Sequence, residues 1–303
     1  MTKAVDLFSN KIDQFRFGTE VKGSYFYLHK KVLAASYKIF PCQGQKPGKY
    51  TIRTKNYLCF MHNLKKESTL PKSSIDQKSA EAETEVFKEK LFELQNLLYA
   101  NQKHSLLIIL QGMDASGKDG TVRHVFSSMN PMGVNVKAFK APTAEEKSHD
   151  FLWRIYQHVP PEGMIAIFNR SHYEDILVPV THKDLDMKII ERRYGIINSF
   201  EESLEDSGTI ILKFFLHVSK EEQKRRLEER LTKPRKKWKY DPADDAERPN
   251  WSTYMKTYET IFDRCGKERP WIIVPSDKKW YRNYVIAKKI TKTLEGLKMK
   301  YPS

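Results

Sequence analysis

The sequence reads LLIILQGMDASGKDGT from Leu106 to Thr121, and the expected fold follows from this stretch. Its apolar first part has the length and composition of a buried strand in a parallel sheet. After the strand, Gly112, Gly117 and Lys118 follow the spacing Gly-x-x-x-x-Gly-Lys. In that phosphate-loop pattern, backbone N–H groups surround a phosphate, the next helix adds its dipole, and the lysine reaches the outer phosphate oxygens. The predicted phosphate-binding residues are Gly112, Ser116, Gly117, Lys118, Asp119, Gly120 and Thr121.

Two acidic residues depart from the common form of this loop. Asp119 stands where a Ser or Thr hydroxyl usually binds magnesium, and Asp114 lies inside the loop. Carboxylates repel phosphates unless a divalent cation lies between them, so we expect a Mg²⁺ site in which Asp114, with Asp119, replaces the missing hydroxyl. The alternative is a glycine-rich turn with two solvated aspartates. The strand before the loop and the helical spacing after it favour the phosphate loop.

The composition indicates a soluble protein of a reducing compartment. The three cysteines, Cys42, Cys59 and Cys265, are widely spaced and form neither a CxxC pair nor a Cys/His metal pattern. No apolar run approaches the length of a membrane span, and the first residues lack the apolar core of a signal peptide. We therefore expect a cytoplasmic protein without structural disulfides.

The formal net charge of +15 suggests an anionic partner, but the charge is unevenly distributed. Residues 1–72 contain 14 Lys and Arg against 4 Asp and Glu, a net charge of +10, which leaves +5 for the remainder. This basic N-terminal extension interleaves lysines with aromatic residues, a composition that can bind nucleic acid. No nucleic-acid-binding motif is legible in it, so solvated lysines are the favoured interpretation. We place its boundary at the Ser- and Pro-containing segment 68–74.

Strands and helices alternate along the rest of the chain, which predicts a parallel sheet covered on both faces. Strands are expected at 106–110, 134–139, 164–168, 209–216 and 271–275. Helices are expected at about 76–100, after the loop, at 145–158, at 186–206, after Ser219 and through 285–297. Ligands of such sheets bind at the carboxyl ends of the strands.

The third predicted strand ends in three polar residues of interest. In a phosphate-loop enzyme, the neighbouring strand usually ends in an acid that holds magnesium, but here that position is the neutral Asn169. Glu174 can supply the missing charge, and Arg170 would point toward the phosphates and offset charge in a transition state. The alternative is an ordinary turn with a surface Arg and Glu. We expect His172 to be structural rather than a general base.

A basic helix follows the fourth predicted strand. Residues 220–239 contain 10 basic and 4 acidic residues, and Arg226 and Arg230 share one helical face, with Arg225 beside them. Such a run is usually a solvated helix. The density of arginine and the Pro-broken basic loop that follows favour a mobile lid, over about 220–246, that closes on phosphates.

Four ordered motifs can now be read together: GMDASGKDGT at 112–121, FNRSHYED at 168–175, LKFFLHVS at 212–219 and WIIVP at 271–275. Together they resemble the polyphosphate kinase 2 family, and the similarity extends from about residue 85 to residue 302. The resemblance implies an α/β, P-loop kinase-like parallel sheet with helices on both faces and an arginine-rich lid, in a domain from 73 to 303. It also implies a kinase that moves phosphoryl groups between inorganic polyphosphate and nucleotides with Mg²⁺.

The resemblance carries roles onto individual residues. Asp114 and Asp119 match the loop acids of the family, Lys118 its phosphate lysine, Arg170 the arginine of its second motif and Arg230 its essential lid arginine. The implied catalytic set is Asp114, Lys118, Arg170, Glu174 and Arg230, the implied metal ligands are Asp114, Asp119 and Glu174, and Asn169, Arg225 and Arg226 join the phosphate and nucleotide site.

The residues Asn169 and Glu174 indicate which nucleotides accept the phosphoryl group. Family members that prefer nucleoside diphosphates have Asp and Asn at these positions, and the Asn/Glu combination resembles the subgroup that phosphorylates both AMP and ADP. A polyanionic donor also needs a basic groove. Its candidate residues are Lys140, Arg154, Lys220, Lys233, Lys236 and Lys237.

The expected function is therefore reversible transfer of phosphoryl groups from inorganic polyphosphate to AMP and ADP, giving ATP. Two alternatives stay open: an ATP-dependent nucleoside or nucleotide kinase, and a nucleic-acid-binding protein with a degenerate phosphate loop. Guanine nucleotides are further candidate acceptors, no membrane partner is expected, and the resemblance implies a homo-oligomer.

Overall fold

The computed structural model describes residues 62–302, so the expectations for residues 1–61 lie outside the described residues. Helices and strands alternate along the chain, as the sequence predicts. In chain order the elements are α3 (Gln77–Asn101), β1 (Ser105–Gln111), α4 (Lys118–Val125), η2 (Pro131–Gly133), β2 (Val134–Ala138), α5 (Ala144–Ser148), α6 (Trp153–Tyr156), β3 (Ile165–Asn169), α7 (Glu174–His182), α8 (Met187–Asp206), β4 (Thr209–His217), α9 (Lys220–Thr232), η3 (Pro234–Lys239), α10 (Pro242–Ala246), η4 (Arg248–Asn250), α11 (Trp251–Cys265), β5 (Trp271–Pro275) and α12 (Lys279–Gly296).

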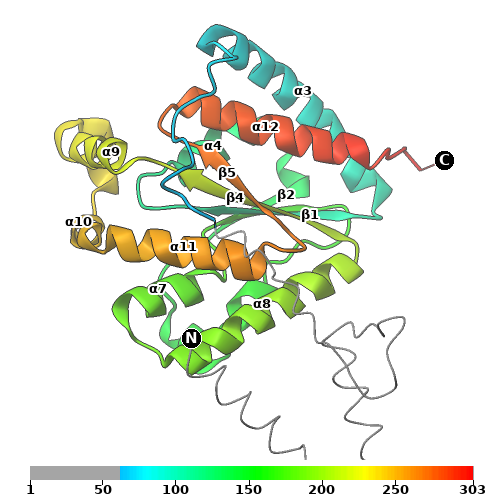
Figure 1. Ribbon diagram of the computed structural model, residues 1–303. Coiled ribbons are helices and arrows are strands. Elements are labelled where there is room, and N and C mark those ends of the chain that lie inside the picture. The colour runs from blue at the N-terminus through cyan, green and yellow to red at the C-terminus, as the bar shows by residue number, and fades with distance from the viewer. Residues whose placement is uncertain (1–61, 303) are drawn as a thin grey trace, which may run out of the picture. The chain divides into compact units, whose positions relative to one another are not determined.

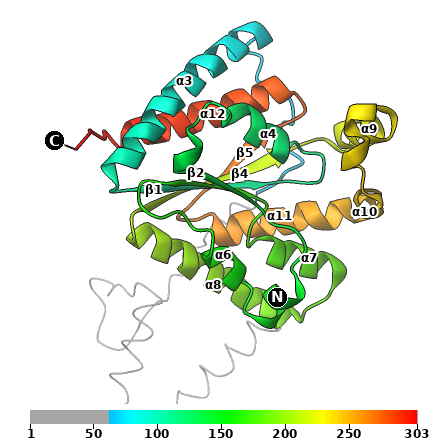
Figure 2. The same cartoon turned by 180° about the vertical axis from the view of Figure 1, so that it is seen from behind.

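The five strands form one parallel sheet in the order β2-β3-β1-β4-β5. All seven residues of β1 are buried because it lies at the centre of the sheet and helices cover both faces. Helices α3, α4 and α12 cover one face, and α7, α8 and α11 cover the other (Figures 1 and 2). This arrangement confirms the α/β fold expected from the alternating pattern.

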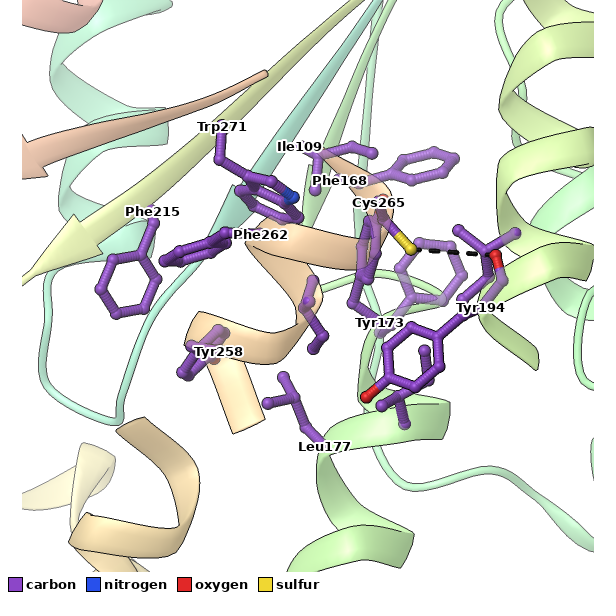
Figure 3. Close-up of a cluster of buried hydrophobic side chains, with 14 of the residues drawn as sticks. Ile109, Phe168, Tyr173, Leu177, Tyr194, Phe215, Tyr258, Phe262, Cys265 and Trp271 are labelled. Atoms are coloured by element: carbon purple, nitrogen blue, oxygen red, sulfur yellow. Dashed lines mark hydrogen bonds between the residues drawn. The ribbon is translucent and has the colours of Figure 1, made fainter. Parts of the chain in front are cut away.

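An aromatic core fills the space between the sheet and helices α8 and α11 (Figure 3). The ring of Phe262 lies 5.2 Å from that of Phe215 and 5.3 Å from that of Trp271, measured between centroids. Trp271 in turn contacts Tyr173 edge-on at 4.9 Å. Because Tyr173 lies between Arg170 and Glu174 in the segment after β3, this packing fixes the backbone that presents both residues to the site.

The helix expected at 145–158 is broken into two short helices, α5 and α6. The backbone at His149 is extended, which ends α5, and the Asp150 carboxylate accepts a hydrogen bond from Leu152 N at 2.9 Å. Local hydrogen bonding by an aspartate therefore competes with the continuous helix. Leu152 and Ile155 are nevertheless buried, as their spacing predicts.

Residues 62–72 pack on the sheet unit, although the sequence analysis placed them in the N-terminal extension. Leu64 is buried, its N–H donates to Glu259 Oε1 at 2.7 Å, and its carbonyl lies 3.1 Å from His217 Nε2. Thr69 Oγ1 donates to Asp277 Oδ2 at 2.8 Å. The boundary expected at residue 72 is therefore wrong for this segment.

In the described part of the chain, none of the helices combines the length and the apolar character that crossing a membrane requires. Cys265 is a buried free thiol, and burial raises its pKa to about 12. Cys42 and Cys59 lie outside the described residues.

Candidate active site

Three segments meet where the strands end. The loop 112–117 follows β1, Asn169 ends β3 and Arg170 follows it, and α9 follows β4. Register pairs Leu110 with Asn169 and Gln111 with Phe215, so the ends of the three strands lie side by side. Figure 1 shows α9 and α10 beyond the ends of β4 and β5. The sheet thus brings the motifs together at the edge where ligands of parallel sheets bind.

The loop has the backbone that the glycine pattern predicts. Gly112 and Gly117 have φ values of +148° and +110°, which residues with side chains rarely adopt. A Cβ on Gly112 would lie 2.8 Å from the carbonyl oxygen of Leu216. The hydroxyls of Ser116 and Thr121 are buried, and neither has a hydrogen-bond partner among the described residues. Buried hydroxyls normally find partners, so these two fit a site that binds a polar ligand.

Lys118 is folded against the loop. Its Nζ donates to the carbonyls of Gly112 at 2.7 Å and Met113 at 3.2 Å, and the side chain is buried. Burial, and then the charge of Arg170, lower the pKa of Lys118. The charges of Asp114, Glu174 and Asp119 oppose that shift, and a phosphate at the loop would add a further negative partner for the ammonium.

Arg170 lies between two acids. Its Nη2 donates to Asp114 Oδ1 at 2.5 Å, and its Nη1 lies 3.7 Å from Glu174 Oε2. The charges of Glu174 and Asp114 raise the pKa of Arg170. Burial raises the pKa of Glu174, although Arg170 and Lys118 oppose that shift. The structure thus brings Arg170, Asp114 and Glu174 together beside the loop, as expected from the sequence.

Asp119, in the first turn of α4, faces the neighbouring strand and the lid. Asn169 Nδ2 donates to its Oδ1 at 2.7 Å, and Lys239 Nζ lies 3.3 Å from its Oδ2. Burial alone would raise the pKa of Asp119, but the hydrogen bond from Asn169 and the charge of Lys239 lower it. Asn169, which was expected to join the phosphate and nucleotide site, thus donates to a loop acid.

The three expected metal ligands do not form a complete protein site. Within residues 62–302 no group of three or more His, Cys, Asp or Glu side chains is placed to hold a metal ion. Asp114, Asp119 and Glu174 instead face Arg170, Asn169 and Lys239. Magnesium usually takes one or two carboxylates and completes its shell with water and phosphate oxygens. The donors present therefore fit a Mg²⁺ ion that shares its shell with bound phosphates.

Arg230, in the proposed lid, pairs with an acidic residue that lies near Asp114. Its Nη1 forms an ion pair with Asp244 of α10 and donates to the carbonyl of Lys239 at 3.1 Å. Burial, and then the charge of Asp114, raise the pKa of Asp244, while Arg230 opposes that rise. The lid thus brings both a cation and an extra carboxylate close to Asp114.

Two other arginines of α9 were expected to bind phosphate or nucleotide, but in the structure both pair with acceptors of the protein itself. Arg226 is buried, and its guanidinium donates to Glu222 Oε1 and to the backbone carbonyls of Ala115, Ser116, Ser276 and Asp277. Arg225 pairs with Glu222 and Glu229 on the helix surface. Arg226 therefore braces the loop from behind, and its direct contact with phosphate stays a prediction.

The candidate groove residues are only partly available to a polyanion. Arg154 is buried, and it donates to the carbonyl of Lys140 at 2.9 Å and pairs with Asp175 at 3.1 Å. Lys233 and Lys236 both pair with Glu229 at 2.5 Å. Arg154 is thus a structural residue rather than part of a groove.

Sequence reasoning missed several residues at the site. Gln223 Nε2 donates to the carbonyl of Asp114 at 3.1 Å, which ties the first turns of α9 to the loop. Lys239 and Asp244 belong to the basic run and to the acidic segment after it, and no local pattern separates them from their neighbours. Arg282 of α12 lies behind the loop, in a helix that the sequence marks only by its apolar spacing.

Comparison with known proteins agrees with this geometry. Residues 74–302 match the family described as Polyphosphate kinase 2 (PPK2). The chain belongs to the polyphosphate kinase 2 family. The family membership and the resemblance read from the four motifs therefore coincide, and the match begins near the start of α3.

Individual members of the polyphosphate kinase 2 family are similar over most of their length. The AMP/ADP-polyphosphate phosphotransferase of Meiothermus ruber is 47% identical over 218 residues, which cover 72% of this chain and 82% of the relative. The ADP-polyphosphate phosphotransferase of Rhodopseudomonas palustris is 43% identical over 227 residues, 71% of this chain and 78% of the relative. The crystal structure of polyphosphate kinase 2 from Arthrobacter aurescens TC1 superposes with a TM-score of 0.75 at 45% identity, and the match covers 78% of this chain and 85% of that one.

Proposed function

We propose that this chain transfers phosphoryl groups from inorganic polyphosphate to AMP and to ADP, reversibly. The observation that supports this proposal is the position of Arg170, whose guanidinium lies between Asp114 and Glu174 beside a loop with the phosphate-binding glycine pattern. Alternating charges of this kind suit a site where two anions must approach one another. The Meiothermus ruber relative, whose name includes both AMP and ADP, supports the choice of acceptors.

Phosphoryl transfer requires the protein mainly to hold donor and acceptor in line and to offset their negative charge. An oxygen of the acceptor phosphate attacks the terminal phosphorus of polyphosphate, and the bond from that phosphorus to its bridging oxygen breaks. The polyphosphate leaves one unit shorter and carries the electron pair. The acceptor is already an anion, so no general base is needed. Lys118, Arg170 and Arg230 would offset charge on the transferring group and hold the reactants in line.

Asp114, Asp119 and Glu174 are the residues that would hold Mg²⁺. A magnesium ion at these carboxylates would neutralise charge on the donor and acceptor phosphates and keep the acids from repelling them. This assignment explains why a loop for anions carries two aspartates.

A single incubation tests the function. The protein is mixed with AMP, magnesium and polyphosphate in the absence of ATP, and the nucleotides are separated over time. We expect ADP first and ATP later. Turnover only with ATP as donor would select an ATP-dependent nucleotide kinase, and no turnover together with salt-sensitive RNA binding would select a nucleic-acid-binding protein.

Three further expectations belong to this proposal. Guanine nucleotides as acceptors are tested by replacing AMP with GMP and GDP in the same incubation. A homo-oligomer is tested by light scattering of the full chain. A cytoplasmic location, expected from the sparse cysteines, is tested by fractionating cells that make the protein.

A further inference from the structure

Arg282 of α12 is buried to 1% exposure directly behind the phosphate loop. Its Nη1 donates to the carbonyl of Ser116 at 3.4 Å, and its Nη2 donates to Asn283 Oδ1 at 3.0 Å. A Cβ built on Gly117 would lie 1.9 Å from Nη1, and one on Gly120 would lie 3.3 Å from Nη2. The guanidinium therefore occupies the space that side chains at these two glycines would fill.

The contact with Ser116 bears on how the loop presents its N–H groups. Arg226 Nη1 donates to the same carbonyl at 2.9 Å, so two guanidiniums hold one peptide group. In a planar trans peptide the C=O and the N–H point in opposite directions. With the Ser116 carbonyl turned toward the arginines, the N–H of Gly117 is turned away from them, as phosphate binding requires.

The charge of Arg282 has no acidic counterpart in the described chain. Its partners are the side-chain amide of Asn283 and the backbone carbonyl of Ser116, and no carboxylate pairs with it among residues 62–302. Burial, and then the charge of Arg226, lower the pKa of Arg282 to about 9. The N-terminus of α4 adds positive partial charge at the same place. A buried cation without a counter-ion destabilises a fold, so this corner is unfavourably positive until an anion binds.

We propose that Arg282 is a positioning residue of the phosphate loop, and that the phosphate bound by the loop balances its charge. The proposal rests on the proposed function only in requiring that the loop binds a phosphate chain, from polyphosphate or from a nucleotide. It also accounts for Gly120 in the first turn of α4, where Ala would favour the helix. A glycine at this position leaves room for the guanidinium.

The test compares binding with stability in Arg282→Met, which removes the charge at similar length. The dissociation constant of inorganic tripolyphosphate is measured by calorimetry without nucleotide, and Tm is measured with and without it. We expect tripolyphosphate binding to weaken about 10- to 100-fold, the scale of losing one favourable interaction with a charged group. Without ligand, Tm should be equal to or above that of the wild type, because an uncompensated charge has been removed.

Arg269→Met is the matched control. Arg269 is partly buried, and it donates to the carbonyl of Asn198 and lies 3.6 Å from a Glu201 oxygen and 3.5 Å from a Glu205 oxygen, away from the loop. Its loss should lower Tm without ligand and leave tripolyphosphate binding unchanged. Arg282→Lys, which keeps the charge, should bind within about threefold of the wild type.

Wild-type tripolyphosphate binding by Arg282→Met would overturn the proposal, whatever the Tm of that variant. If the methionine variant does not fold, Arg282→Gln is compared with Arg282→Lys, and equal binding by these two would also overturn it. Tripolyphosphate binding needs no acceptor, so the comparison holds even if the wild type forms no ADP from AMP. That second failure would count against the proposed function alone.

Discussion

Arg170 shows how one residue can carry both strain and function. Its φ of +64° lies in the left-handed region, which costs a residue with a side chain about 1–3 kcal/mol. Ion pairs with Asp114 and Glu174 hold the side chain on either side. Strain of this kind persists only where the surroundings fix the residue, and here the aromatic packing of Tyr173 does so. The residue type was predictable from the motif, whereas the backbone conformation was not.

Glu174 should make stability depend on pH. Burial raises its pKa, so the folded protein binds this proton more tightly than the unfolded chain does. The ionised carboxylate therefore costs stability above its folded pKa, and the cost disappears as pH falls below the unfolded value. Glu174→Gln should be more stable than the wild type in urea unfolding at pH 8, with a difference that shrinks toward pH 4. The exposed Glu85→Gln is the control, and a Glu174→Gln protein less stable than wild type at pH 8 would contradict the prediction.

The same side chain should influence the acceptor. Glu174→Asn removes a negative charge beside Arg170 and Lys118 while keeping a polar group, and the family pattern associates Asn here with diphosphate acceptors. We expect kcat/KM for AMP to fall about tenfold or more, roughly the loss of one charge-assisted contact, and that for ADP to fall less. Initial rates with each acceptor at saturating polyphosphate measure this. Equal losses on both acceptors would remove Glu174 from acceptor selection.

At the scale of elements, helices with a continuous apolar face were predictable and others were not. The helical spacing of Ile190, Tyr194 and Ile197 predicts one apolar face for α8, and all three residues are buried in the structure. The sequence analysis did not predict α7, which is short and contains Pro179. It also missed α11, although Tyr258, Ile261, Phe262 and Cys265 have helical spacing there. Strand order and the approach of α12 to the loop depend on distant packing, which local patterns do not encode.

The proposed lid, residues 220–246, places Arg230 near the loop. Gln223 anchors the start of α9 to the loop, and about two helical turns later Arg230 faces Asp244. Bound phosphates would replace Asp244 as the partner of this guanidinium. Arg230→Ala should lower kcat by about 10³-fold, the scale of a lost transition-state arginine, and leave the circular dichroism spectrum unchanged.

Arg264→Ala is the control for the lid variant. Arg264 pairs with Glu191 at 2.7 Å on the surface between α11 and α8, so its loss removes an arginine ion pair without touching the loop. Its kcat should match the wild type. An Arg230→Ala enzyme within twofold of the wild type would exclude Arg230 from the transition state.

At the scale of the whole molecule, most of the excess positive charge lies in a different part of the sequence from the candidate active-site residues. The site residues described above lie between 112 and 282, whereas much of the positive excess lies in the first 72 residues. The described basic groups near the lid are partly neutralised by acids, as Lys233 and Lys236 are by Glu229, whose pKa they lower to about 2. Net charge alone therefore indicated an anionic partner correctly in kind, but it did not indicate where that partner binds.

This separation predicts the effect of deleting residues 1–61, which contain 11 Lys and Arg against 3 Asp and Glu. The shortened protein should keep the kcat of the full chain with tripolyphosphate, because all the described site residues remain. With long polyphosphate its KM should rise less steeply with salt, since fewer counterions are released when a less basic protein binds a polyanion. Initial rates at 50 to 300 mM KCl, with each donor, measure both effects. A tenfold loss of kcat with tripolyphosphate, in a protein of unchanged Tm, would mean that the first 61 residues contribute to the site itself.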